Sequence, residues 1–190
     1  GSRLATWLLR RAGWTVSFEG LPSLQGVLVV YPHTSNWDFI VLVLAKWSVG
    51  LQVSFWAKDS LFGIPLFGRW LRWVGGIPVK RHAAQGVVGQ AVEVIRSKRA
   101  KNEYFWLGLS PEGTRRLTPG WRSGFYQTAL RAGGTLGVFK IDFARKVVDA
   151  RSFIALTGDV QKDFERLRMI LKGVQGCRPE NASPIQLIER

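Results

Sequence analysis

The fold is decided by the stretch Val27-Leu28-Val29-Val30-Tyr31-Pro32-His33-Thr34-Ser35-Asn36-Trp37-Asp38. Residues 27–31 are an unbroken apolar run, which is typical of a strand that is buried on both faces of a sheet. Residues 37–49 continue with a pattern that predicts a helix. The polar residues between the two therefore lie where a buried strand ends and a helix begins.

The alternation of strand and helix continues along the chain. Strands are expected at residues 15–19, 104–109, 136–143 and 153–157 and near Val53 and Ile77, and helices at residues 65–73, 86–98, 124–132 and 160–172. This alternation indicates an α/β fold, with a central, mostly parallel mixed sheet that is covered by helices. A chain of 190 residues with 46% hydrophobic content fits a single domain over residues 1–190. Residues 174–190 are expected to form an irregular tail.

The N-terminal segment predicts an amphipathic helix. Leu4, Trp7 and Leu8 recur at helical spacing over residues 3–12, and arginines flank them at both ends. We interpret residues 3–14 as a helix that lies on a membrane surface. The alternative is that the apolar face packs on the protein core, because amphipathicity alone does not say whether lipid or protein covers it.

The charge of the chain points to anionic partners. There are 27 Lys and Arg against 13 Asp and Glu, which gives a net charge of +14. Nucleic acid, phospholipid headgroups and a phosphate- or CoA-bearing substrate all fit this charge. Nine Trp and eleven Phe favour a membrane interface. We find no RNA-binding aromatic pattern and no zinc-finger spacing, so nucleic acid is not expected as a partner.

Metal binding is not expected either. Cys177 is the only cysteine, which excludes a cysteine-based metal cluster and an intrachain disulfide.

The first chemical motif is the pair His33 and Asp38. Asp38 is expected about one turn into the helix, where side chains lean back toward the helix start, so its carboxylate can hydrogen-bond the imidazole. In that role it favours the imidazolium and leaves the other ring nitrogen free to deprotonate an alcohol. The alternative is a capping box with Ser35, in which Asp38 only caps the helix.

Two further motifs carry arginines at strand ends. Glu112-Gly113-Thr114-Arg115 follows an apolar strand, and Gly75-Gly76-Ile77-Pro78-Val79-Lys80-Arg81 runs from a glycine turn into a short strand. Glycine lets a ligand approach the backbone, and arginine binds phosphate in a bidentate manner. Taken separately, such motifs are more often an ordinary turn with a solvated arginine and a strand with a basic end.

In this order the motifs resemble those of the glycerolipid acyltransferases, the family of 1-acylglycerol-3-phosphate and related lysophospholipid acyltransferases. The resemblance runs from about residue 27 to residue 158 and includes residues 33–38, 58–68, 75–81, 112–115 and 122–124. It implies a glycerol-3-phosphate acyltransferase-like fold. Three departures leave the acyl acceptor open, namely Lys80, His82 and a proline-containing fourth motif that is not evident in residues 134–139.

The resemblance also implies residue roles. His33 becomes the general base and Asp38 its partner. Arg81 and Arg115 are expected to bind the phosphate of the acceptor, and Glu112, Gly113 and Thr114 to shape that site. Lys58 is expected to be an additional cation at the site, with a snorkelling lysine as the alternative.

The expected activity is transfer of a fatty acyl group from an acyl-CoA or acyl-carrier-protein thioester to the hydroxyl of a lysophospholipid. The default acceptor is 1-acylglycerol-3-phosphate, which gives phosphatidic acid in phospholipid biosynthesis. No cofactor besides the acyl donor is expected. The protein is expected at the cytoplasmic face of a membrane as a peripheral protein. The alternatives are a noncatalytic lipid- or carrier-protein-binding module and a thioester hydrolase in which His33 activates water.

Overall fold

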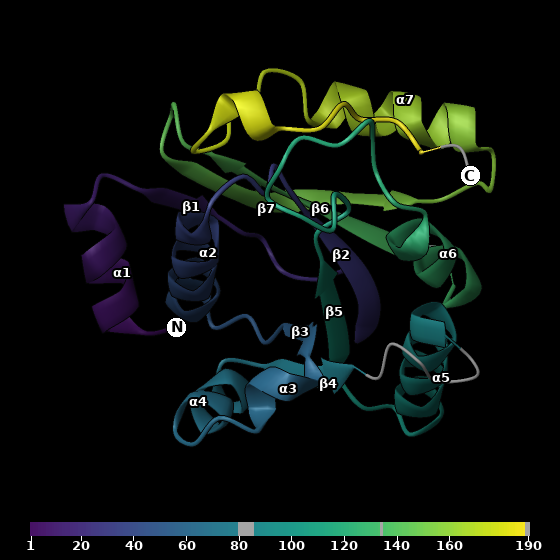
Figure 1. Cartoon of the computed structure of the whole chain (residues 1–190), viewed down its shortest axis with the longest axis horizontal. Coiled ribbons are helices and arrows are strands. Elements are labelled where there is room, and N and C mark those ends of the chain that lie inside the picture. Colours follow the sequence, from purple (N-terminus) through teal and green to yellow (C-terminus); the bar gives the residue numbers. More distant parts are fainter. Residues whose placement is uncertain (80–85, 134, 189–190) are drawn as a thin grey trace.

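The computed structural model describes residues 1–79, 86–133 and 135–188. A seven-stranded sheet forms the centre of the molecule, with helices on both of its faces (Figure 1). The strands are β1 Thr15–Ser17, β2 Gln25–Tyr31, β3 Ser54–Lys58, β4 Gly76–Val79, β5 Phe105–Leu109, β6 Thr135–Asp142 and β7 Val147–Ala155. The helices are α1 Arg3–Arg11, α2 Asn36–Val49, α3 Asp59–Phe62, α4 Phe67–Trp73, α5 Gly86–Ala100, α6 Gly124–Arg131 and α7 Val160–Ile170.

The sheet confirms the predicted architecture. Its strand order is β1-β7-β6-β2-β5-β3-β4, and every neighbouring pair is parallel except the antiparallel pair of β6 and β7. The α/β fold with a mostly parallel mixed sheet and an N-terminal helix is therefore as expected. Among the described residues, no helix has the length and apolar character needed to cross a membrane.

Strand β2 is buried on both faces, as its apolar run predicts. Val27 and Val29 face a core that is completed by α5, α6 and α7, whereas Leu28 faces the opposite core. Helices α1 and α2 cover the opposite face, where Leu9 packs with Val41. Burial on two sides fixes β2 in the middle of the sheet, so the residues that follow it have a rigid support.

The expected boundaries differ from the structure mainly at β7. The strand begins at Val147, before the predicted start at residue 153. Val148 and Ala150 are buried. Asp149 and Arg151, which alternate with them, form an ion pair of 3.0 Å on the other side of the strand. Buried apolar residues alternate with charged residues at the start of β7. The prediction relied on the continuous apolar run that begins at residue 153, so it placed the start of the strand too late.

Parallel strands bring their carboxyl ends to one edge of the sheet. The register pairs Val29 of β2 with Leu109 of β5 and pairs Lys58 of β3 with Val79 of β4. The carboxyl ends of β2, β3, β4 and β5 therefore meet at the same edge, which is where open α/β sheets bind their ligands. All of the predicted site residues follow or end one of these strands.

Candidate active site

His33 and Asp38 lie together at the start of α2. The imidazole Nδ1 is 3.3 Å from Asp38 Oδ2, and the Asp38 side chain is fully buried. The same Oδ2 accepts hydrogen bonds from the main-chain N–H groups of Thr34, at 2.6 Å, and Ser35, at 2.9 Å. Asp38 therefore caps the helix and faces the imidazole at once, so the two alternatives drawn from the sequence are both present in one carboxylate.

The second ring nitrogen of His33 is available for chemistry. The side chain is 20% exposed, and no described residue forms a hydrogen bond with Nε2. A carboxylate at Nδ1 favours the tautomer whose proton is on that nitrogen and stabilises the ring when it takes up a second proton. The arrangement leaves Nε2 free to accept a proton.

Glu112 is a fully buried carboxylate that links the two main motifs. Its Oε2 accepts the main-chain N–H of His33 at 2.6 Å, and its Oε1 accepts the main-chain N–H of Ser183 at 2.8 Å. Burial raises the pKa of Glu112, and these two bonds act in the opposite direction. Through Oε2, Glu112 holds the loop after β2 against its own loop after β5, and through Oε1 it holds the C-terminal segment at Ser183.

Gly113 occupies a position that requires glycine. Its φ is +67°, and a Cβ there would lie 3.0 Å from both Cδ and Nε of Arg122. The Arg122 side chain thus lies directly against this turn of the loop. Thr114 is partly buried, and its hydroxyl accepts the main-chain N–H of Arg116 at 3.4 Å.

Two of the three predicted cations, Arg115 and Lys58, belong to the described residues. Arg115 is exposed, and within the described residues nothing pairs with its guanidinium. Lys58 is exposed at the end of β3, on the same edge. Arg81 lies outside the described residues, two positions beyond the end of β4 at Val79.

Sequence reasoning did not place Arg122 or Ser183 in the site. Arg122 belongs to the motif at residues 122–124, and its position in the loop between β5 and α6 was the available signal. Ser183 had no signal, because it lies in a tail without periodicity. The structure brings both residues to the loop that carries Glu112.

A small cavity of about 140 Å³ opens beside this loop. It lies between the ends of β3 and β5 and the starts of α5 and α6, and Arg122 lines it together with Trp56 and Phe125. Within the described residues, no group of His, Cys, Asp or Glu has the arrangement of a metal site.

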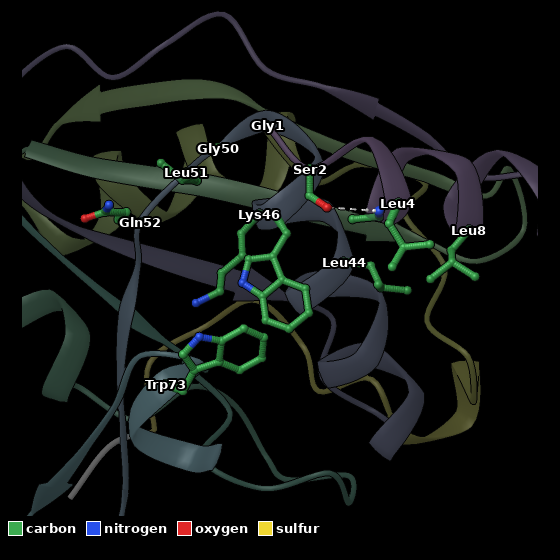
Figure 2. Close-up of a pocket in the computed structure, with 12 residues that line it drawn as sticks. Gly1, Ser2, Leu4, Leu8, Leu44, Lys46, Gly50, Leu51, Gln52 and Trp73 are labelled. Carbon is green, nitrogen blue, oxygen red and sulfur yellow. Dashed lines mark hydrogen bonds between the residues drawn. The ribbon is translucent and has the colours of Figure 1, made fainter. Parts of the chain in front are cut away.

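A larger hollow of about 650 Å³ lies away from this chemistry (Figure 2). Leu4 and Leu8 of α1, Leu44 of α2 and Trp73 of α4 line it, with Lys46 at one side. It is at the C-terminal end of α2, whereas His33 precedes the N-terminal end of that helix. A helix of this length separates the two by about 20 Å, so the hollow is not the site of the motifs.

The fold has a match among solved structures. The crystal structure of the 1-acyl-sn-glycerophosphate (LPA) acyltransferase PlsC from Thermotoga maritima is similar, with a TM-score of 0.53 and 19% sequence identity. The match covers 88% of this chain and 73% of that one. No curated protein matches the chain.

The sequence has a match among protein families. Residues 14–155 match the profile of the family described as Acyltransferase. This span contains every motif on which the resemblance to the glycerolipid acyltransferases was based, and that resemblance is confirmed. The chain belongs to the acyltransferase family and is an acyltransferase enzyme.

Proposed function

We propose that this enzyme transfers a fatty acyl group from an acyl-CoA or acyl-carrier-protein thioester to the hydroxyl of a lysophospholipid. The acceptor that fits best is 1-acylglycerol-3-phosphate, and the product is then phosphatidic acid. The observation that carries the proposal is the pair of His33 and Asp38, joined through Glu112 to the loop that presents Arg115. The similar fold of a lysophosphatidic acid acyltransferase supports the same acceptor class.

In this mechanism His33 is the general base. Its Nε2 takes the hydroxyl proton of the acceptor as the oxygen attacks the thioester carbonyl, and Asp38 stabilises the imidazolium that forms. The tetrahedral intermediate collapses and expels the thiolate, which receives the proton from the imidazolium. The reaction needs no covalent enzyme intermediate and no cofactor besides the acyl donor.

The phosphate of the acceptor is assigned to the basic groups of the strand edge. Arg115 and Arg81 supply guanidinium groups, with Lys58 as an additional cation. Gly113 and Thr114 shape the loop around the anion, and Glu112 fixes that loop through its hydrogen bond with the His33 N–H. Both carboxylate oxygens of Glu112 already accept backbone N–H groups, so the residue does not have to contact the substrate.

Replacing Arg115 or Arg81 with alanine should raise the KM of the acceptor about tenfold, because each change removes a charge-assisted hydrogen bond to phosphate. The KM of the acyl donor should change much less. Steady-state kinetics with each substrate varied in turn measure this difference. Arg131→Ala, an exposed arginine at the far end of α6, serves as the matched control.

An uncharged monoacylglycerol acceptor provides a second comparison for the two arginines. Without a phosphate, Arg115→Ala should leave the acceptor KM unchanged. An equal rise of KM with the uncharged acceptor would rule out a phosphate contact for this residue.

A membrane surface is the proposed location, at its cytoplasmic face. Leu4, Trp7 and Leu8 of α1 are 66%, 57% and 40% exposed, while Ala5 and Leu9 on the other side of the helix are buried in the core. The apolar residues that defined the amphipathic pattern thus remain uncovered. Trp70 and Trp73 of α4 are exposed as well. Exposed Trp and Leu beside arginines suit an interface with anionic lipids.

The triple variant Leu4→Ser/Trp7→Ser/Leu8→Ser should reduce binding to phosphatidylglycerol vesicles more than tenfold in a flotation assay. Each side chain contributes about 1.5–3 kcal/mol when it leaves water, so losing them together removes most of the apolar insertion. The fold should survive, since the buried residues of α1 are retained. Met169→Ser, which changes a residue that is 70% exposed on α7, is the control.

Raised salt should weaken the remaining attraction to the vesicles. Wild-type protein that stays unbound at low salt would contradict the membrane location. Binding that the triple variant leaves intact would assign the interface to another surface.

One assay separates the proposed function from its alternatives. Mixed micelles with lysophosphatidic acid and an acyl-CoA should release free thiol only when the acceptor is present. Equal release without acceptor would identify a thioester hydrolase, and no release with either CoA or carrier-protein donors would identify a noncatalytic lipid- or carrier-protein-binding module.

A further inference from the structure

The C-terminal residues 173–188, called the strap here, lie outside the span that matches the acyltransferase family. Apart from the short 3₁₀ helix Pro179–Asn181, the strap has no regular helix or strand. It runs along α7 and beside the loop that leads from β5 to α6 (Figure 1). Its residue Ser183 is nevertheless fully buried.

Every polar group of Ser183 bonds to an element of the candidate site. Its N–H donates to Glu112 Oε1 at 2.8 Å, and its carbonyl accepts the Tyr31 hydroxyl at 3.1 Å. Its hydroxyl oxygen lies 2.8 Å from the Thr118 hydroxyl and accepts the Thr118 N–H at 3.0 Å. Tyr31 ends β2 just before His33, and Thr118 belongs to the loop that carries Arg115.

The strap also contacts the loop of His33 directly. The N–H of Arg178 donates to the Thr34 hydroxyl at 3.1 Å. Gly176 lies so close that an added Cβ would be 2.7 Å from the same hydroxyl oxygen. Further along, the main-chain N–H of Trp121 donates to the Gln186 carbonyl at 2.6 Å. The strap therefore contacts both loops of the site.

We propose that Ser183 is a positioning residue for acyl transfer, which acts through Glu112 on His33. The proposal rests on the function proposed above. One carboxylate oxygen of Glu112 accepts the N–H of His33, and the other accepts the N–H of Ser183 in the strap. A shift of Ser183 therefore moves the Glu112 carboxylate, and with it the group that holds the His33 N–H. Tyr31 and Thr118 fix Ser183 in turn, which makes it the point where three segments are aligned.

Such a role differs from general stabilisation in what it predicts. A displaced catalytic group slows the chemical step even when both substrates still bind, because reactivity depends steeply on the geometry of attack. A residue that only stabilises the fold changes the melting temperature and leaves the folded enzyme as active as before. The turnover number and the KM values therefore distinguish the two.

The test uses Ser183→Ala and Tyr31→Phe, each of which removes one hydroxyl from this network. We expect each to lower kcat about tenfold at temperatures where the protein is folded, with the KM of both substrates within twofold of wild type. In addition, hydrogen exchange of the His33 amide should accelerate, since its acceptor is less firmly held.

Tyr126→Phe is the matched control. Tyr126 is also buried in the same core, and its hydroxyl donates to Asp163 Oδ2 at 2.7 Å, away from Glu112. This change should lower the melting temperature with kcat within twofold of wild type. If Ser183→Ala does not fold, Thr118→Val removes the partner hydroxyl instead and carries the same expectation.

Folded variants with wild-type kcat and wild-type exchange at His33 would overturn the proposal. An equal loss of kcat in Tyr126→Phe would overturn it too, because the effect would then be general. Wild-type protein without acceptor-dependent transfer would contradict the proposed function instead, and the exchange measurement would still decide whether the strap holds His33.

Discussion

Replacing His33 with alanine is expected to reduce acyl transfer about 10²- to 10⁴-fold, the range that a positioned general base contributes. The imidazole sits at the open edge of the sheet, with one nitrogen toward Asp38 and the other free. Without it, the two carboxylates of the site are poor substitutes for the base. Glu112 and Asp38 Oδ2 already accept backbone donors, and Asp38 Oδ1 is buried. Release of thiol in the presence of lysophosphatidic acid measures the loss.

The fold should tolerate the change at His33. Its main-chain N–H still donates to Glu112 in the alanine variant, so the thermal transition should stay close to that of wild type. His33→Gln, which keeps a polar side chain of similar length, should be as inactive as His33→Ala. Near-wild-type turnover in either variant would show that another group is the base.

Asp38→Asn is expected to lower kcat about 10²-fold, less than the loss of the base itself. An asparagine oxygen can still accept from Thr34 and Ser35, but the neutral amide no longer favours the imidazolium. The variant should also be less stable, since hydrogen bonds to a charged acceptor become bonds to a neutral one in a buried position. Kinetics and thermal unfolding of the same preparation measure both effects.

Asp163→Asn gives a matched comparison for Asp38→Asn. Asp163 is likewise fully buried and accepts the Thr157 and Gly158 N–H groups together with the Tyr126 hydroxyl, near the start of α7. It should destabilise the protein without lowering kcat of the folded fraction. Similar kcat losses in both variants would mean that Asp38 acts only as a structural cap.

Much of the fold was predictable because buried strands and helices have recognisable patterns of apolar residues in the sequence. The apolar run of β2 and the helical pattern after it identified the centre of the sheet, and their order gave the α/β class. The start of β7 was missed since Asp149 and Arg151 interrupt its apolar residues, although the two neutralise one another on the strand. Helix α3 is too short to leave a periodic pattern.

The part of the site that depends on residues close together in the sequence was predictable. The pairing of His33 with Asp38 depends on one turn of helix, so the sequence contains it. The contact of Glu112 with the N–H of His33 joins residues 79 positions apart and follows from the parallel register of β2 and β5. Ser183 approaches Glu112 from a segment without periodicity, and neither spacing nor residue type indicates that contact.

During synthesis on the ribosome, this site is completed by residues that emerge well after its motifs. Ser183 is 71 positions from Glu112 and 152 from Tyr31, so their hydrogen bonds join distant parts of the chain. Contacts over such separations form late, because the intervening chain must first be ordered. A nascent chain that has reached Arg122 already contains His33, Asp38 and Glu112, but the buried Glu112 carboxylate still lacks one of its two donors. The newly made enzyme therefore contains His33, Asp38 and Glu112 well before the hydrogen bonds that align them are complete.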